Sequence, residues 1–352
     1  MSASNPNFFR NLARTKLFWP LVALALMLVF NLIFTKGFFH IEIKDGHLYG
    51  SLIDILNRAA PLMLIVIGMT LVIATSGIDI SVGAVVAISG ALVAMLIGGT
   101  LVLKGGVQEY VTLVPMPLAI LAALAAATLV GLWNGLMVSR VGMQPIVATL
   151  ILLMAGRGIS QLITNGQIIT IYYKPYFFVG NGFLLGIPFS LYIVLAVLLF
   201  TLYITRRTAL GLFIESIGIN PNASRMAGIN AKNLLLCVYA FCALCAGIAG
   251  LIVCSNVKSA DGNNAGMYFE LDAILAVVLG GTSTAGGKFY LIGSIVGALI
   301  IQTLTTTIYS IGVPPEITLV VKALVVFVVM LFQSETFRKI VFNRFGGKVG
   351  QS

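Results

Sequence analysis

The chain has 352 residues, of which 59% are hydrophobic and only 9% are charged, whereas about a quarter of the residues of a soluble globular protein are charged. So few polar side chains cannot cover a water-facing surface, which excludes an ordinary soluble domain. The net charge of +10 does not indicate a nucleic-acid partner, because the Lys and Arg residues lie between apolar runs rather than in one stripe. The composition predicts a multi-pass membrane protein surrounded by lipid.

Apolar runs long enough to cross a bilayer follow one another along the chain and predict an all-α fold of about ten transmembrane helices. The first run follows basic residues and lacks a small-residue cleavage site, so it is interpreted as a retained helix rather than a signal peptide. The eighth run is short and is interpreted as a half-helix or as a helix that begins near Met267. The runs are Leu17–Phe34, Ala59–Thr75, Val82–Leu103, Pro117–Val138, Ile146–Ile163, Phe189–Ile204, Asn233–Cys254, Leu271–Gly281, Tyr290–Tyr309 and Ile317–Phe332.

The basic residues predict which side of the membrane each loop faces. With ten spans and a cytoplasmic N-terminus, 13 Lys and Arg residues fall on the inner side and 5 on the outer side, in agreement with the positive-inside rule. The inner set is Arg10, Arg14, Lys16, Arg140, Arg206, Arg207, Arg225, Lys232, Lys288, Arg338, Lys339, Arg344 and Lys348, and the outer set is Lys36, Lys44, Lys104, Lys174 and Lys258. We therefore expect cytoplasmic tails at 1–16 and 334–352 and a transmembrane domain at 17–333.

Asp79 interrupts the apolar stretch between the second and third spans. It could cap a helix that begins at Ile80, where a carboxylate is favoured by the helix dipole, or it could line a solute pathway. The neighbouring Ser76 and Ser81 can form hydrogen bonds with backbone groups that leave the helices at this point.

Further polar residues lie within or near the apolar runs and are candidates for a translocation pathway, since a neutral solute rich in hydroxyls needs donors and acceptors without net charge. Each one alone is also explained by a hydrogen bond between helices. Together with Asp79 and Asp272, the candidates are Asn134, Gln144, Arg157, Asn263 and Asn264.

The inner loop 206–232 is too long for a simple turn and is patterned. Thr208–Ile217 is interpreted as a short amphipathic helix that Gly218 ends. Asn220 then offers an N-cap, Pro221 suits the first helical position and Gly228 suits the C-terminal stop of a second helix of about two turns. Such a loop is either a docking element for a partner or an interfacial helix on lipid headgroups, and the pattern alone does not decide.

Two carboxylates, Glu270 and Asp272, stand at the start of the eighth run. They are either functional groups at membrane depth or solvated groups at the outer interface, and no further acid or His forms a proton relay with them. The stretch Gly280–Lys288 fails the phosphate-loop pattern because Thr282 replaces its first Gly and Phe289 follows the Lys. We expect instead a re-entrant turn buried in protein.

Paired glycines either favour a tightly packed bundle, because small residues allow helix backbones to approach closely, or reflect only that glycine is common in such helices. Gly293 and Gly297 form a GxxxG pattern, and Gly247 and Gly250 lie together in the seventh run.

Catalytic and metal-binding motifs are not expected in this chain. The four cysteines lie in or at the end of one apolar run, where packing is favoured over redox chemistry or zinc binding. The two histidines, His40 and His47, lie in the first loop and cannot supply a catalytic centre. We expect no enzyme activity, no cofactor and no metal.

Four ordered strings resemble the ribose/arabinose-type sugar ABC importer permeases over roughly Leu56 to Leu331. They are TLVIATSGIDISVGAVVAISGALVA, LWNGLMVSRVGMQPIVATLILLMAGRGISQLITNG, TALGLFIESIGINPNASRMAGINAKN and ELDAILAVVLGGTSTAGGKFYLIGSIVGALII. Within that family, SLIDILNRAAP at Ser51–Pro61 and DGNNAG at Asp261–Gly266 resemble the galactofuranose importer permeases.

The resemblance implies the membrane-spanning permease of an ATP-driven importer for a monosaccharide, such as galactofuranose or a related furanose or pentose, in the bacterial inner membrane. It implies a cytoplasmic ATPase, a periplasmic sugar-binding protein and a second, related permease subunit as partners. It also favours the docking interpretation of the loop 206–232, because the family pattern E-x-x-G-x-N-x-x-A-x-x-x-x-G is matched by Glu215, Gly218, Asn220, Ala223 and Gly228. The alternative is a secondary sugar transporter or facilitator that works without ATP.

Overall fold

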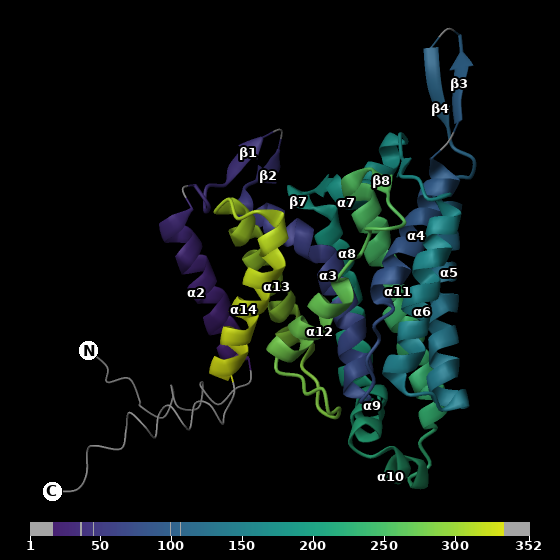
Figure 1. Cartoon of the computed structure of the whole chain (residues 1–352), viewed down its shortest axis with the longest axis vertical. Helices are drawn as coiled ribbons and strands as arrows, with labels where there is room; N and C mark the ends of the chain where they lie inside the picture. The colour runs from purple at the N-terminus through teal and green to yellow at the C-terminus, as the bar shows by residue number, and fades with distance from the viewer. Residues whose placement is uncertain (1–16, 36, 45, 99, 106, 334–352) are drawn as a thin grey trace, which may run out of the picture.

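The computed structural model describes residues 17–35, 37–44, 46–98, 100–105 and 107–333, and this part of the chain is predominantly helical (Figure 1). Its main helices are α2 (Phe18–Phe34), α3 (Ser51–Ala74), α4 (Val82–Ile97), α5 (Met116–Leu136), α6 (Pro145–Ile163), α8 (Phe189–Arg207), α9 (Leu210–Ile219), α10 (Pro221–Met226), α11 (Ala231–Val257), α12 (Phe269–Leu279), α13 (Leu291–Ser310) and α14 (Pro315–Gln333). A π-helical turn, Met137–Val141, extends α5, and α7 is the short helix Phe178–Asn181 after the 3-10 turn Lys174–Phe177. The predicted tails 1–16 and 334–352 lie outside the described residues.

Six of the described helices are long and apolar enough to cross a membrane, namely α3, α5 with its π-turn, α6, α8, α11 and α13. Helices α2 and α4 and the segment Ile317–Leu331 of α14 are apolar but shorter. The protein is therefore a multi-pass membrane protein, and the count of about ten spans stays a prediction. The eighth predicted span is the 11-residue helix α12, which fits the half-helix interpretation.

Helices α9 and α10 lie at one end of the bundle, and the hairpins lie at the other (Figure 1). The first turn of α2 and the last turn of α14 point toward the end that carries α9 and α10, as expected if both chain termini share that side. The opposite end carries the short antiparallel pairs β1–β2 (Glu42–Lys44 and His47–Tyr49), β5–β8 (Ile169–Thr170 and Ser259–Ala260) and β6–β7 (Phe183–Leu184 and Ile187–Pro188).

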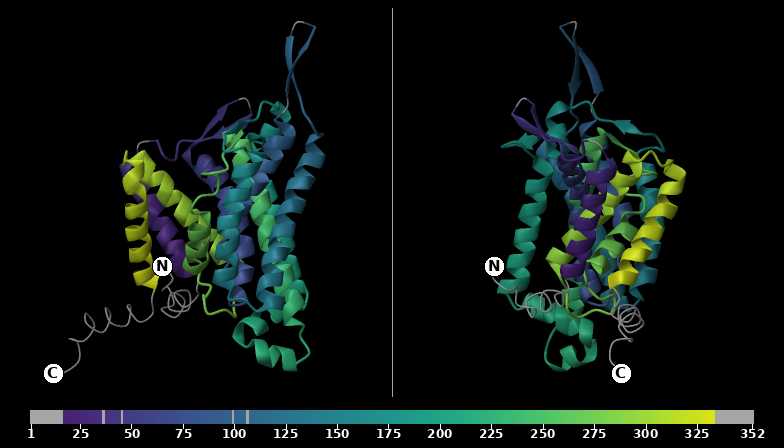
Figure 2. Two further views of the ribbon diagram at one scale, coloured as in Figure 1. Left: turned by 45° about the vertical axis from the view of Figure 1, so that its right-hand side comes forward. Right: turned by 90° about the vertical axis from the view of Figure 1, so that its left-hand side faces the viewer.

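The third predicted span was too long at its C-terminal end. Helix α4 ends at Ile97, and the remainder of the apolar run forms the strand β3 (Thr100–Lys104), which pairs antiparallel with β4 (Val107–Val111). Figure 2 shows this hairpin projecting beyond the bundle, at the end opposite α10. Hydropathy alone could not separate strand from helix here, because an apolar run ending in a Gly-Gly turn fits both.

The core is built around α3 and α11. Helix α3 is buried along its length from Ala59 to Ala74, and α11 packs against α3, α4 and α5. Glycines allow these helices to pack closely. A side chain at Gly68 of α3 would meet the backbone of Cys242, and one at Gly250 of α11 would overlap Ser89. Cys242, Cys245 and Cys254 are buried, as packing residues would be, whereas Cys237 is exposed.

The predicted GxxxG pattern of α13 is a real contact. A Cβ at Gly297 would overlap the carbonyl oxygen of Ala276, and one at Gly293 would overlap that of Gly280. The two glycines therefore allow α13 to lie directly against the backbone of α12, which is the close approach that this pattern provides in membrane helices.

Candidate functional site

The loop between α8 and α11 folds into two consecutive helices. Helix α9 runs from Leu210 to Ile219, so the prediction that Gly218 ends the first helix was wrong. Gly218 is helical, and it is buried in contact with other backbone segments rather than acting as a stop. A side chain at this position would overlap the carbonyl oxygen of Ala74, and this tertiary constraint is invisible to local sequence rules.

The second helix has the predicted caps. The side-chain oxygen of Asn220 accepts hydrogen bonds from the backbone N–H groups of Asn222 and Ala223, each at 3.0 Å, and Pro221 occupies the first helical turn. Gly228 follows the helix with a φ of +84°, in the left-handed region that glycine tolerates at helix ends. Both ends of α10 are thus capped by residues of its own sequence.

Helices α9 and α10 differ in burial. Ile214 and Ile217 of α9 are buried against the bundle, and Glu215 is half-buried. Helix α10 projects from the end of the bundle (Figure 1), with Ala223 exposed and Met226 91% exposed. One helix is therefore anchored in the bundle while the other presents a rigid, water-accessible surface.

A second feature is a non-helical segment, residues 258–268, between α11 and α12. Its carbonyl groups are satisfied by side chains of α6: the Ser160 hydroxyl donates to the carbonyl oxygen of Gly262 at 2.7 Å. The Arg157 guanidinium donates through one nitrogen to the carbonyl oxygens of Ala265 (2.5 Å) and Asn263 (3.3 Å). Irregular backbone in a membrane protein persists only where protein groups or water satisfy it, and α6 provides those groups here.

The same segment presents polar side chains to the surface. Asn263 and Asn264 are exposed, and the Asp261 carboxylate accepts hydrogen bonds from both of their backbone N–H groups and from the Asn264 amide. Burial by itself raises the pKa of Asp261, but these hydrogen bonds and the charge of Arg157 outweigh it and hold that pKa below its usual range. The segment therefore carries an anionic turn, fixed by hydrogen bonds, beside the exposed side chains of Asn263 and Asn264.

Glu270 stands in the first turn of α12, near Arg157 of α6. Glu270 is only 8% exposed. A Cβ on Gly83 would touch both the Glu270 carboxylate and the Arg157 guanidinium, so the two groups lie on the same side of that glycine. The interpretation of Glu270 as a solvated group at the outer interface is therefore wrong, because this side chain is buried although its neighbours Tyr268 and Leu271 are exposed.

Asp79 and Asn134 lie together inside the bundle, and neither is exposed to solvent. Asp79 accepts hydrogen bonds from the backbone N–H (2.9 Å) and hydroxyl (2.6 Å) of Ser81, and Asn134 donates to the Ser81 oxygen at 2.8 Å. Helix α4 begins at Val82 rather than Ile80, so the predicted cap is replaced by a turn closed on Ser81. This cluster ties the 75–81 segment to α5.

Asp272 and Lys322 form an ion pair between α12 and α14, with 2.5 Å between the ammonium nitrogen and the carboxylate oxygen. The two side chains are only 17% and 12% exposed, so Asp272 is not a solvated surface charge either. Each charge has the other as its partner, so neither side chain needs a bound solute to explain its place between α12 and α14.

Replacing Lys322 with methionine should destabilise the protein by about 3–5 kcal/mol, because it leaves the Asp272 carboxylate buried without a partner. The double variant Asp272→Asn, Lys322→Met should recover most of that loss. Thermal unfolding in detergent measures both variants, and equal destabilisation by the single and double variants would show that the pair is not the cause.

The seven candidate pathway residues thus fall into separate groups. Asp79 joins Asn134, Arg157 joins the 261–265 segment with Asn263 and Asn264, and Asp272 joins Lys322. Gln144 is exposed and precedes α6, apart from these groups. The contributions of Ser160 and Ser81 were not predicted, because one serine among many in apolar helices carries no signal of its partner.

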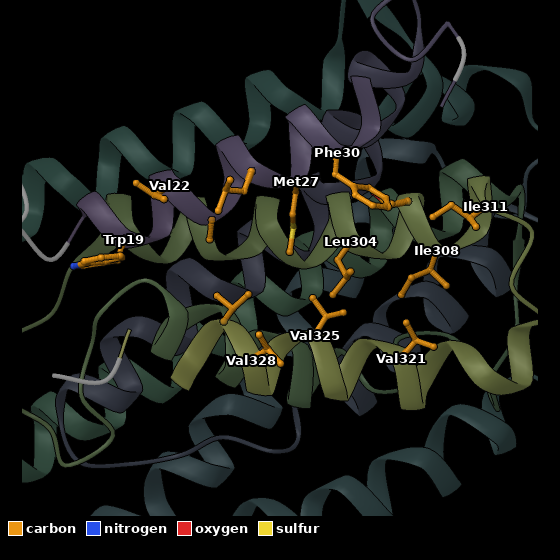
Figure 3. Close-up of a pocket in the computed structure, with 14 residues that line it drawn as sticks. Trp19, Val22, Met27, Phe30, Leu304, Ile308, Ile311, Val321, Val325 and Val328 are labelled. Carbon is orange, nitrogen blue, oxygen red and sulfur yellow. The ribbon is translucent and has the colours of Figure 1, made fainter. Parts of the chain in front are cut away.

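An apolar groove lies between α2, α13 and α14, with a volume of about 560 Å³. Figure 3 shows Met27, Phe30, Leu304 and Val325 facing it from these three helices. Thr307, in its wall, already bonds to Asn31 and to the Thr303 carbonyl oxygen. The groove is lined almost entirely by apolar side chains, and its chemistry suits lipid chains or apolar protein side chains.

Comparison with known proteins places these features in context. Residues 51–330 match the family model described as a branched-chain amino acid transport system / permease component. The chain is 48% identical over 329 residues to the galactofuranose transporter permease protein of Escherichia coli K12, covering 92% of each chain.

Two further relatives cover the chain equally well. The fructose import permease protein of Bifidobacterium longum NCC 2705 is 40% identical over 338 residues, covering 94% of this chain and 91% of the relative. The ribose import permease protein of Escherichia coli K12 is 34% identical over 319 residues, covering 90% and 92%.

Proposed function

The chain belongs to this family of transport-system permease components, and we propose that it is the inner-membrane permease through which an ATP-driven importer moves a monosaccharide. The relatives named for galactofuranose, fructose and ribose support a sugar as the solute, and the 48% identity makes galactofuranose the first candidate. A separate cytoplasmic ATPase, a periplasmic sugar-binding protein and a second, related permease subunit complete the transporter.

The observation that carries this proposal is the pair of helices α9 and α10. A six-residue helix capped by its own sequence, exposed at the end of the bundle and continuous with a buried helix, is suited to receive a push from a partner. Glu215, Gly218, Asn220, Ala223 and Gly228 form the ATPase-coupling element in this proposal.

The mechanism is alternating access without covalent chemistry on this chain. ATP binding closes the ATPase subunits and displaces α10, and α9 transmits that displacement to the bundle. A partner can shift the equilibrium between outward-open and inward-open states only by contacting the two states differently. The exposed surface of α10 is where those contacts are made.

The sugar passes along the face formed by α6 and the 261–268 segment. Asn263 and Asn264 are exposed there, and an amide both donates and accepts hydrogen bonds, as sugar hydroxyls require. Arg157 holds the segment in place from behind. Asp79 and Asn134 support the neighbouring helices from inside the bundle.

Co-purification and transport together test the proposal. The chain, expressed with candidate ATPase and second permease subunits from the same genome, should retain the ATPase through purification. In vesicles with the sugar-binding protein, a panel of galactofuranose, ribose, fructose and arabinose should show ATP-dependent uptake of one sugar above the rest. Absence of the ATPase from the purified complex would contradict the proposal.

A further inference from the structure

We propose that Ser76 is a positioning residue that clamps the coupling helix α9 to two other segments, the end of α3 and the α12–α13 loop, so that all three move as one body. This inference rests on the proposed function and adds the route by which displacement of α9 reaches α4 and α12.

Three backbone segments meet at this junction. The Gly287 N–H donates to the carbonyl oxygen of Ala74 at 2.9 Å, which joins the α12–α13 loop to the end of α3. Gly218 of α9 packs on the same point, since a Cβ there would overlap the Ala74 oxygen and lie 2.5 Å from the Gly287 nitrogen. No side chain separates the three backbones, so a displacement of one is felt directly by the others.

The Ser76 hydroxyl lies between α9 and the α12–α13 loop, which both contact the end of α3. Its oxygen is 2.8 Å from the carbonyl oxygen of Gly218 and 2.9 Å from that of Ala285, and it shares its single hydrogen between them. Through these two carbonyl oxygens, the Ser76 hydroxyl connects α9 to the α12–α13 loop. A Cβ at Gly286 would overlap the Ser76 oxygen, so the glycine at that position keeps the hydroxyl in place.

The backbone conformation of Ser76 indicates that the hydroxyl is needed. Ser76 follows the last residues of α3 with a φ of +63°, a left-handed conformation that is usually given to glycine or asparagine at a helix end. Its N–H donates to Ile73 and that of Gly77 to Val72, as in an ordinary helix stop. Glycine would satisfy the stop with less strain but could not donate to Gly218 and Ala285.

The junction also explains the glycines of the 280–288 stretch. Gly286 and Gly287 both have φ near +90°, and Gly287 is covered by the side chain of Ile219. The α12–α13 loop therefore reaches the end of α3 as a bare backbone. Beyond Ser76 the chain continues through residues 77–81 into α4, while the loop that carries the two glycines connects α12 to α13.

The variant Ser76→Gly tests the clamp with little net change in folding stability. It loses the hydrogen bonds of the hydroxyl but relieves the left-handed strain, so its melting temperature should stay close to that of the wild type. Sugar uptake by the complete complex should fall by about fivefold or more, since loss of about 1 kcal/mol from a coupling equilibrium is already a fivefold change. The ATPase should still co-purify, and its basal ATP hydrolysis should persist while stimulation by the sugar-loaded binding protein is lost.

Asn165→Gly is the matched control. Asn165 is an exposed residue just beyond α6 with a φ of +51°, so its replacement relieves the same strain away from the junction and should leave uptake unchanged. Gly286→Ala should also lower uptake, because a Cβ there overlaps the Ser76 oxygen and lies 2.9 Å from the carbonyl oxygen of Gly218.

Uptake and stimulated ATP hydrolysis of Ser76→Gly within twofold of the wild type, with the ATPase bound, would overturn the clamp alone. If the wild-type chain fails to retain the ATPase, the proposed function fails first and this inference with it. Should Ser76→Gly not insert in the membrane, Ser76→Ala provides the same loss of the hydroxyl and the same readouts.

Discussion

Replacing Gly218 with valine should reduce sugar uptake by at least about tenfold while the chain still inserts in the membrane and binds its sugar-loaded delivery protein. A side chain at this position meets the Ala74 oxygen and the Gly287 nitrogen, and both are backbone atoms that cannot rotate away. Helix α9 must move outward to relieve the overlap, and about 1.4 kcal/mol of imbalance between the two transport states is enough for a tenfold effect. Stimulated ATP hydrolysis should fall in parallel.

Two control variants separate the effect of side-chain size from the effect of position. Gly218→Ala should have a smaller effect than Gly218→Val, since less volume has to be accommodated. Gly158→Val adds the same side chain to a helical glycine in α6 where a Cβ meets no atom within 4 Å, and should leave assembly and thermal stability near the wild type. If Gly218→Val transported sugar normally, α9 could not be held at the junction in the way described.

Replacing Arg157 with methionine should loosen the 261–268 segment and lower uptake by about tenfold or more. Hydrogen bonds from a charged donor contribute about 1.5–3 kcal/mol each, and the variant loses those to Ala265 and Asn263. It also removes the cation beside the buried Glu270. Hydrogen exchange of the backbone amides of residues 261–268 measures the loosening directly.

Arg157→Lys should recover only part of the protection, because the ammonium of a lysine ends closer to the backbone on a flexible stem than the guanidinium nitrogen that donates to both carbonyl oxygens. Gln161→Met is the control for losing a polar side chain on the same helix. Gln161 is exposed, and its replacement should leave exchange of the 261–268 amides unchanged. Wild-type protection in Arg157→Met would remove the argument that α6 holds this segment.

Local sequence rules predicted the features that depend on neighbours in the chain. The caps of α10 follow from Asn220, Pro221 and Gly228. Asn220 bonds to backbone N–H groups two and three residues along the chain, Pro221 occupies the first turn, and Gly228 takes the left-handed conformation after the helix. The contact of Gly293 and Gly297 with α12 follows from their spacing on one face of a helix. The apolar runs located the main helices for the same reason, since hydropathy is a local property.

Features that depend on distant segments could not be predicted in this way. Gly218 was interpreted as a helix stop, but its small size serves contacts with Ala74 and Gly287. Asp272 has Lys322 as its partner, 50 residues away in the sequence. Polar residues in apolar runs show that something must satisfy them, but only the packing of helices shows what does so.

Uptake by purified components in proteoliposomes tests the central claim most directly. The chain reconstituted with its second permease subunit and ATPase, with sugar-loaded binding protein outside and ATP inside, should accumulate the sugar against its gradient. Omitting ATP, or replacing it with a non-hydrolysable analogue, should abolish accumulation. Equilibration of the sugar by this chain alone, with neither ATPase nor ATP present, would contradict the account and identify a facilitator instead.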